Sequence, residues 1–529
     1  MRRLFAAFLT LSLLPFAVGQ PGTTTRVSVS SAGVEGDDFC RNSTLSGDGR
    51  YVAFLSRAST LVAGDTNGMI DIFVRDRQTA QTIRVSVSSG GVQANNNSTF
   101  PSISRDGRYI AFTSNATNLV ANDTNNATDC FVYDMVTAET TLVSRNSSGT
   151  QGNLHSNNAH LSADGNFCTF SSDATNLVAN DTNNQHDAFV HNRTTGETTR
   201  ISLSSTGTQG NGISFPTSLS ADGRFVAFES SANNLVAGDT NGFRDVFLHD
   251  RLSAETTRVS VSAASAQGNN SSYDANISGD GRYIVYRSVA NNLVLSDTNN
   301  NFDVFLYDRL TGAVSMVSLD SLGKQGNRGA SDPTISENGR IVSFASDSSG
   351  LVSGDTNQGT DLFVKDLLTG NLRRVSVSTS GGQAFLGGIN YPAMSSDGRV
   401  VSFQSESKNL VPSDTNNESD IFVNEVGPTN ELVGFTINVA TLAGQNRTIG
   451  TVQMAFPAVL RSDVITIVNS NHLIMPAQIT IDAGAMSKVF AIQAMPMVTT
   501  ISETVVVRYG FQSETANLLL VPFVPSSLQ

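Results

Sequence analysis

The chain contains no tryptophan, only three cysteines and little lysine. Its 529 residues include 33 lysines and arginines against 46 aspartates and glutamates, which gives a formal net charge of −13. Proteins that bind nucleic acid need a basic surface, so this composition argues against a nucleic-acid partner. Beyond residue 18 no apolar run approaches the ~18 residues that span a bilayer, so we expect no transmembrane anchor.

The N-terminus has the features of a secretory signal peptide. Arg2 and Arg3 precede an apolar stretch over 4–18, and small residues lead up to Gly19. This pattern predicts a signal peptide over 1–19 and a mature protein that is secreted, periplasmic or displayed on the cell surface.

One heptapeptide pattern, Asp-Thr-Asn-x-x-x-Asp, occurs seven times. Five of the six spacings between copies are 58 residues and the last is 59. A fixed period of this length indicates a repeat architecture, in which each unit buries its apolar faces against its neighbours.

Each repeat predicts four short strands joined by turns. In the second repeat the strands cover 100–104, 109–114, 130–134 and 140–144, with an Asp-Gly turn of the primed type at 106–107. Four-stranded antiparallel units arranged radially form a β-propeller, so seven repeats predict seven blades. Two aromatic positions in each repeat, one in the second strand and one in the third, are expected to pack between adjacent blades.

The ends of the repeat array indicate a closed ring. The sequence Arg-Val-Ser-Val-Ser of the fourth strand at 84–88 also occurs at 26–30, before the first complete repeat. The last repeat has no such strand. We therefore expect residues 24–30 to pair with the strand at 421–425, which removes the exposed edge of the ring.

Of the three cysteines, Cys40, Cys130 and Cys168, the last two are predicted to be buried free thiols and not partners in a disulfide. Cys130 and Cys168 align with aliphatic residues in the other repeats, so each replaces a core side chain. Free cysteine packs as a small apolar residue.

The repeat resembles a known type. The segment Ser104-Arg105-Asp106-Gly107-Arg108-Tyr109-Ile110-Ala111-Phe112, followed by Asp129-Cys130-Phe131-Val132-Tyr133-Asp134, is similar to the WD-like repeat of TolB-type propellers. The resemblance covers residues 23–426 and implies the propeller fold. TolB has an additional N-terminal α/β domain and fewer blades, so its role in the cell envelope is not carried over.

A different domain follows the repeats. From Glu431 the period stops, and seven alternating apolar runs follow at 435–439, 448–454, 464–468, 479–481, 488–492, 505–508 and 518–521. Seven short strands predict an immunoglobulin-like β-sandwich over 429–529, after a propeller over 20–428. The segment 476–490 resembles bacterial immunoglobulin-like surface modules, which usually act as spacers or adhesive units.

The heptapeptides are candidate calcium loops, because their first Asp, their Asn and their final Asp supply hard oxygen ligands. The alternative is purely structural: the Asp and Thr side chains form turns, and the final Asp caps the third strand through backbone N–H groups. The candidate ligands are Asp65, Asn67, Asp71, Asp123, Asn125, Asp129, Asp181, Asn183, Asp187, Asp239, Asn241, Asp245, Asp297, Asn299, Asp303, Asp355, Asn357, Asp361, Asp414, Asn416 and Asp420.

No nucleophile, zinc or phosphate-loop motif occurs in the chain. The histidines at 155, 160, 186 and 191 occupy positions that vary between repeats, so we expect them to be solvated. The period is broken once, by one inserted residue in the loop 385–391. Phe385, Asn390 and Tyr391 of this loop are the first candidates for an asymmetric binding site.

Three functions remain open. The first is a secreted, non-enzymatic binding or scaffold protein whose propeller face engages protein or glycan partners. The second is an extracytoplasmic enzyme acting on polysaccharide in the central channel, which would require unique acids or histidines near the axis, and alignment of the repeats shows none. The third is a calcium-stabilised structural surface protein. Propellers serve both binding and catalysis, so the fold does not choose among these.

Overall fold

The structure is a computed structural model that describes residues 22–385, 388–426, 432–454, 463–468, 472–481, 487–509 and 512–522. The predicted signal peptide lies outside these residues. The described residues form strands and turns without a helix, so the expected all-β class is confirmed. Correspondingly, within these ranges there is no helix of the length and apolarity needed to cross a membrane.

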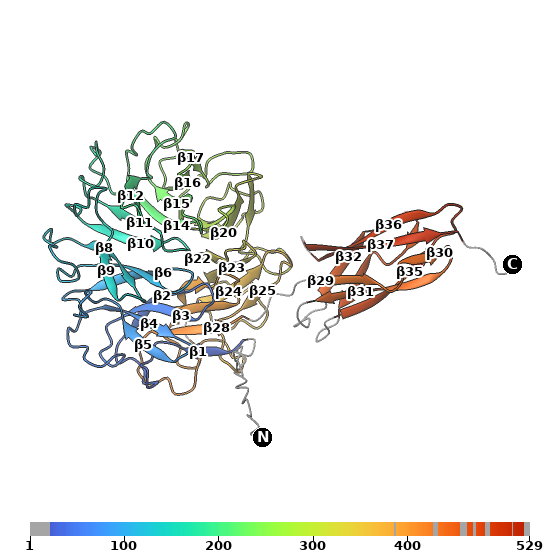
Figure 1. The fold of residues 1–529 in the computed structure, drawn as a ribbon, viewed down its shortest axis with the longest axis horizontal. Helices are drawn as coiled ribbons and strands as arrows, with labels where there is room; N and C mark the ends of the chain where they lie inside the picture. The colour runs from blue at the N-terminus through green and yellow to red at the C-terminus, as the bar shows by residue number, and fades with distance from the viewer. Residues whose placement is uncertain are drawn as a thin grey trace, which may run out of the picture.

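Seven four-stranded antiparallel sheets surround a central axis (Figure 1). We number them as blades 1 to 7 in chain order. Their strands are β2 (Cys40–Leu45), β3 (Tyr51–Ser56), β4 (Asp71–Asp76) and β5 (Gln81–Arg84); β6 (Ser98–Ile103), β7 (Tyr109–Ser114), β8 (Asp129–Asp134) and β9 (Glu139–Leu142); β10 (Ser156–Leu161), β11 (Phe167–Ser172), β12 (Asp187–Asn192) and β13 (Thr198–Arg200); β14 (Ser214–Leu219), β15 (Phe225–Ser230), β16 (Asp245–Asp250) and β17 (Glu255–Arg258); β18 (Ser272–Ile277), β19 (Tyr283–Ser288), β20 (Asp303–Asp308) and β21 (Ala313–Met316); β22 (Ala330–Ile335), β23 (Ile341–Ser346), β24 (Asp361–Asp366) and β25 (Leu372–Arg374); and β26 (Asn390–Met394), β27 (Val400–Ser405) and β28 (Asp420–Glu425) with β1 (Thr24–Arg26).

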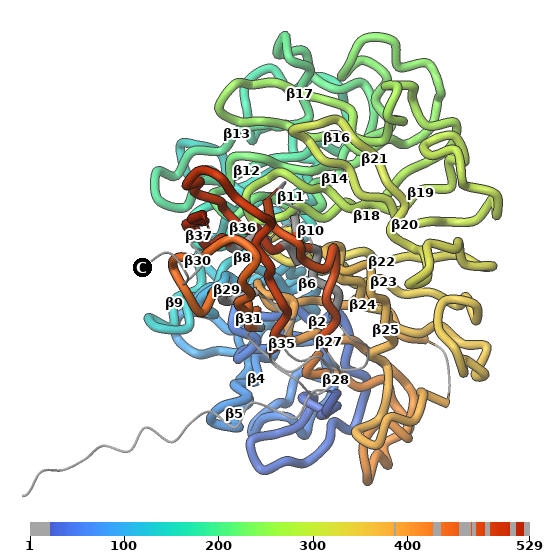
Figure 2. The backbone as a smooth tube through the Cα atoms, turned by 90° about the vertical axis from the view of Figure 1, so that its right-hand side faces the viewer, coloured from blue at the N-terminus to red at the C-terminus, as the bar shows by residue number. Residues whose placement is uncertain are grey.

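The ring closes as the sequence predicted. Strand β1 pairs antiparallel with β28, with Thr24 opposite Asn424 and Arg26 opposite Phe422. The first strand of the described chain therefore completes the last blade, and the tube trace in Figure 2 shows these blue and orange segments side by side. Closure gives the last blade the same four strands as the other six.

Aromatic pairs fill the spaces between blades. The rings of Phe112 and Phe131 stack at 5.8 Å between centroids, and both are fully buried. They share one apolar cluster with Val74 and Val85 of the preceding blade. Equivalent pairs recur in all seven blades, so the predicted packing of these positions between adjacent blades is confirmed.

The Asp-Gly turns differ from the primed turns that the sequence predicts. Gly107 has φ +75°, whereas Asp106 is not in the left-handed region. The N–H of Gly107 donates to the Ser104 carbonyl at 2.9 Å, and Asp106 Oδ1 accepts from the Ser104 hydroxyl at 2.6 Å. The turn is thus an ordinary turn followed by one left-handed glycine, and the aspartate serves as a side-chain brace.

The channel is narrow at the end that carries these turns. Six backbone hydrogen bonds of 2.8–3.0 Å link neighbouring inner hairpins there, in a chain that runs through Gly47, Arg105 and Ala163 and again from Ala221 through Gly279, Glu337 and Ser396 back to Gly47. The Arg105 and Glu337 side chains form an ion pair at 3.0 Å between blades 2 and 6. Neighbouring blades are therefore joined by backbone contacts at one end of the axis.

The C-terminal residues form two sheets around a separate core. One sheet has the order β29 (Leu432–Ile437), β31 (Arg447–Met454), β35 (Ser487–Ala494), β33 (Leu473–Ile474). The other has the order β30 (Thr441–Ala443), β37 (Gln512–Val521), β36 (Ile501–Tyr509), β32 (Asp463–Val468), β34 (Gln478–Ile481). Side chains from both sheets, including Phe435, Phe490 and Val507, share one cluster, which is typical of a β-sandwich. Its immunoglobulin-like identity stays a prediction.

Candidate ligand-binding site at the channel mouth

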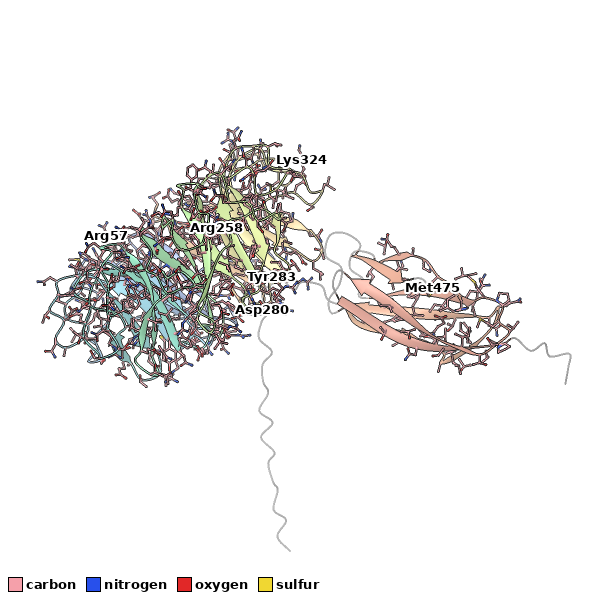
Figure 3. The ribbon with its side chains drawn as sticks, turned by 90° about the horizontal axis from the view of Figure 1, so that it is seen from above. Arg57, Arg258, Asp280, Tyr283, Lys324 and Met475 are labelled. Carbon is pink, nitrogen blue, oxygen red and sulfur yellow. The ribbon has the colours of Figure 1, made fainter. Side chains whose placement is uncertain are left out.

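In five blades an arginine bridges the two aspartates of the heptapeptide loop. Arg258 Nη1 lies 3.1 Å from Asp239 Oδ1 and 3.3 Å from Asp245 Oδ2, and it also donates to Gln267 Oε1 at 3.1 Å. Figure 3 labels Arg258 within the propeller. The same contact between one arginine and both aspartates is made by Arg26, Arg84, Arg200 and Arg374.

In blades 2 and 5 a glutamine amide replaces the arginine. Leu142 and Met316 occupy the arginine position there. Gln325 Nε2 donates to Asp297 Oδ1 at 2.9 Å and to Asp303 Oδ2 at 2.8 Å, and Gln151 makes the matching contacts in blade 2. Because an amide brings no charge, burial raises the pKa of Asp303 to about 6.

The remaining heptapeptide contacts are those of a turn. Asn125 Oδ1 accepts from the Ala127 N–H at 2.9 Å, so the Asn, rather than the first Asp, forms this side-chain turn. Asn125 Nδ2 donates to Asp129 Oδ2 at 3.0 Å and to the Gly152 carbonyl at 2.9 Å. Asp129 Oδ1 accepts from the Ser144 hydroxyl at 2.6 Å, so it is a side chain and not the expected backbone N–H that satisfies this atom.

These donors and acceptors fit a guanidinium or an amide better than calcium, which takes six to eight oxygen ligands. The Asn oxygen is turned to a backbone N–H and the carboxylates hold nitrogen donors. Within the residues that the structure describes, no group of three or more His, Cys, Asp or Glu side chains is placed to hold a metal ion.

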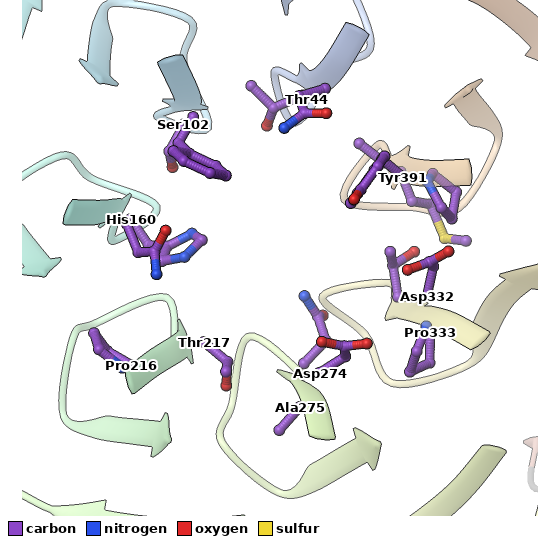
Figure 4. A pocket seen from close by; sticks show the side chains of 18 of the residues that line it. Thr44, Ser102, His160, Pro216, Thr217, Asp274, Ala275, Asp332, Pro333 and Tyr391 are labelled. Carbon is purple, nitrogen blue, oxygen red and sulfur yellow. The ribbon is translucent and has the colours of Figure 1, made fainter. Parts of the chain in front are cut away.

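The open end of the channel holds a cavity of about 650 Å³, lined by the inner strands of all seven blades (Figure 4). Each inner strand is interrupted there by a β-bulge, for example between Thr99 and Ser102 in β6. In six blades a bulged residue has a positive φ, namely Asn42, Phe100, Asn158, Asp274, Asp332 and Tyr391. In blade 4 the aligned residue is Pro216, which pairs with Phe228, and the bulge follows it at Thr217. Aromatic residues are strained in this conformation, and strain of this kind is concentrated at functional sites.

Charged residues gather on one side of this cavity. Arg244 Nη1 donates to Glu229 Oε1 at 3.1 Å, and Arg287 Nε lies 2.6 Å from Asp274 Oδ2. Asp332 accepts from the Ser331 hydroxyl at 3.2 Å and forms no ion pair with any described residue. Burial raises the pKa of each of these three carboxyl groups above its ordinary value.

The two arginines are also covered by aromatic rings. The Arg244 guanidinium lies 5.3 Å from the centroid of Phe215 and 5.5 Å from that of Tyr273. The Arg287 guanidinium lies 4.8 Å from the centroid of Phe302. Stacking of this kind fixes both arginines beside their carboxylate partners.

The irregular loop of the seventh repeat is divided between two places. Tyr391 lies at the cavity and is 53% exposed, and Asn390 precedes it in β26. Phe385 is 72% exposed and is not among the residues that line the cavity. Its N–H donates to Asn409 Oδ1 at 3.0 Å, so it belongs to the connection between blades.

Two histidines differ from the expectation of solvated loop positions. His191 is fully buried in β12, and its Nδ1 is hydrogen-bonded to the Thr198 hydroxyl at 2.9 Å. His160 lies in β10 and lines the cavity, where burial lowers its pKa to about 4. It is therefore neutral near pH 7. In Figure 4 it faces Asp332 and Tyr391 across the channel.

Sequence reasoning missed Glu229, Asp274 and Asp332, although a signal was present. Alignment of the repeats was expected to show no unique acid near the axis. At the position of Glu229 the other repeats have Leu55, Thr113, Ser171, Arg287, Ala345 and Gln404. A charged residue at a position that is apolar or small in other repeats is a signal of a local role, and Glu229 lines the cavity.

Comparison with known proteins yields structural neighbours alone. No family model matches the chain, and no curated protein does. Solved structures with a similar fold include a protein described as TolB from Agrobacterium tumefaciens, with 15% identity, a TM-score of 0.36, and coverage of 56% of this chain and 85% of that one.

A second neighbour is the WD40 repeats of RRP9, with 10% identity, a TM-score of 0.39, and coverage of 76% and 97%. A third is a GH74 enzyme of Niastella koreensis, with 10% identity, a TM-score of 0.40, and coverage of 93% and 67%. The repeat region is a β-propeller. Its expected likeness to TolB-type and WD-like repeats is confirmed at the level of the fold, and these low similarities carry nothing further.

Proposed function

We propose that this chain is a secreted, non-enzymatic binding protein that receives a protein or glycan partner at the open mouth of its propeller channel. The observation that carries the proposal is the cavity of about 650 Å³. Side chains that differ from one repeat to the next line it, and several of them lie on β-bulges with a positive φ. Concave sites with a few convergent polar groups are where proteins usually bind ligands. The C-terminal β-sandwich would serve as a spacer that presents the propeller.

Two observations support binding rather than catalysis. His160 has its pKa lowered to about 4, so it is a weak base at neutral pH. Glu229 and Asp274 each contact an arginine, so one oxygen of each carboxyl group already has a partner within the protein, although burial raises the pKa of both groups.

The proposal is tested by filling the channel mouth. Thr44 lines the cavity from β2, so Thr44→Trp would place a large ring in it, while Thr44→Val preserves the size of the side chain. A thermal-shift panel of basic, acidic and neutral peptides and of oligosaccharides is applied to all three proteins. At least one class should stabilise the unaltered chain and Thr44→Val but not Thr44→Trp. Equal shifts in Thr44→Trp would place binding elsewhere and contradict the proposal.

A second candidate is an enzyme that acts on polysaccharide. It is favoured by Glu229, Asp274 and Asp332, because glycoside hydrolysis uses paired carboxyl groups. We expect no release of reducing ends from polysaccharides incubated with the protein. Release that is lost in Glu229→Gln and retained in Glu255→Gln, a change at an exposed residue of β17, would establish the enzyme instead.

A further inference from the structure

The charged side of the channel mouth has one carboxylate more than it has guanidinium groups. Arg244 pairs with Glu229 and Arg287 pairs with Asp274, which leaves Asp332 with the Ser331 hydroxyl as its donor and the charge of Arg287 shared with Asp274. His160 adds no positive charge, because burial lowers its pKa to about 4. The site is therefore anionic, within a chain whose net charge is −13.

Glu229 also offers an unused acceptor. Its side chain is 11% exposed, and the residue as a whole is 9% exposed. Its Oε1 accepts from Arg244, whereas Oε2 is buried and has no hydrogen-bond partner among the described residues. A buried charged oxygen without a partner costs free energy, so a donor supplied by a ligand would be favourable there.

Aromatic faces complete the mouth. Phe100 and Tyr391 line the cavity and are 46% and 53% exposed. Both are held on left-handed bulges, at φ +51° and +50°. Tyr391 lies next to Asp332 in Figure 4, and its backbone lowers the pKa of that carboxyl group, against the larger effect of burial. Aromatic rings beside a carboxylate form a site for a cation, since the ring faces are electron-rich.

We propose that the channel mouth binds a protonated amine or guanidinium group, which would approach Asp332 and Glu229 Oε2 between the rings of Tyr391 and Phe100. This inference rests on the proposed function and names the ligand class of the same cavity. The group comes from a lysine or arginine side chain of a protein partner or from a free polyamine. A neutral glycan would supply hydroxyl groups but leave the surplus charge of Asp332 unpaired.

The test is calorimetric titration of capped glycine peptides with a central lysine, glutamine or glutamate, and of spermidine. We expect the lysine peptide to bind roughly 10-fold or more tightly than the glutamine peptide, because hydrogen bonds between charged groups are the stronger kind. Tighter binding of the peptide than of spermidine identifies a protein partner, and the reverse order identifies a free amine.

Matched variants locate the binding. Asp332→Asn should weaken the lysine peptide about 10-fold or more, while Asp347→Asn, at an exposed ion pair with Arg328, should leave it unchanged. Glu229→Gln should weaken it and Glu255→Gln should not. Tyr391→Leu should lower affinity about 3-fold by removing the cation–π contact. Asp332 forms no ion pair with described residues, so its variant tests the idea even if Glu229→Gln unfolds.

Two results would overturn this inference. One is equal affinity for the lysine and glutamine peptides, and the other is full affinity in Asp332→Asn. A neutral or acidic ligand that binds the unaltered chain and is lost in Thr44→Trp would leave the proposed function standing while the amine assignment fails. Binding of every ligand unchanged in Thr44→Trp would remove both.

Discussion

Arg84 Nη1 lies 3.0 Å from Asp65 Oδ1, and the same nitrogen lies 3.4 Å from the buried carboxylate of Asp71. The arginine comes from the outermost strand of the blade, while the aspartates bound the loop before the third strand. One guanidinium thus joins the two ends of that loop. Five blades share this arrangement, and in the other two a glutamine amide replaces the arginine. The same loop is therefore held by a charged donor in some blades and by a neutral donor in others.

Replacing the loop arginine should destabilise the propeller. In Arg258→Met, two carboxylates lose their cation, and rotation of Gln267, as seen for Gln325 in blade 5, compensates in part. We expect a loss of about 2 kcal/mol in the free energy of unfolding by urea. Arg258→Lys should lose less, and adding Asp239→Asn to Arg258→Met should recover part of the loss. An unchanged midpoint for Arg258→Met would contradict the proposed role.

Asp303 should make stability depend on pH. Burial raises its folded-state pKa to about 6, above the ordinary value of 3.8. Protonation therefore favours the folded state: the contribution is complete below about pH 4 and is lost as the pH rises through about 6. A shift of two pKa units corresponds to about 2 to 3 kcal/mol. Asp303→Asn should flatten the unfolding free energy between pH 4 and 7, whereas Asp347→Asn should not.

Calcium should have little effect on the melting temperature. The loop arginines already occupy the space between the carboxylates in five blades, and a ligand stabilises only through sites it binds in the folded state. We expect differential scanning calorimetry of residues 20–529 to give the same midpoint with calcium and with excess chelator. A melting temperature that rises by many degrees with calcium would show that the heptapeptide loops bind the metal.

Two glycines with the same backbone conformation should differ in their tolerance of alanine. Gly107 and Gly91 have φ +75° and +77°. A Cβ at Gly107 would lie 2.3 Å from Tyr51 Cδ2 of the preceding blade, whereas a Cβ at Gly91 would meet nothing within 4 Å. Gly91→Ala should cost about 1 kcal/mol from backbone strain alone. Gly107→Ala should cost about 3 kcal/mol or more in urea unfolding. Equal losses would mean that contact between blades is unimportant at this turn.

The three thiols should not react with thiol reagents in the folded protein. Cys40, Cys130 and Cys168 are buried and unpaired. Burial raises the pKa of Cys168 to about 12 and raises that of the other two thiols as well. Because the thiolate is the reactive form, a thiol reagent should label none of them at pH 8 and all three after unfolding. Rapid labelling of the native protein would show that a blade opens.

Much of the fold could be predicted from the sequence because every blade packs against its neighbour with side chains of the same type at the same positions. The two aromatic positions recur every 58 or 59 residues since each blade must fill the same space against its neighbour. The copy of the fourth-strand sequence at 26–30 revealed the closure, which requires one strand to cross from the start of the chain to its last blade. The primed turn was wrong because Ser104 and Asp106 together favour an ordinary turn before Gly107.

The residues of the channel mouth could not be predicted from the sequence, because the repeat that reveals the blades does not extend to them. Periodicity constrains residues that pack, and the bulged residues of the inner strands point into open space, so their identities follow no rule of the repeat. Phe100, Asp332 and Tyr391 are far apart in the chain and meet because the ring closes. The sequence determined the blades, their number and their closure. The tertiary structure alone decided which side chains face one another across the channel.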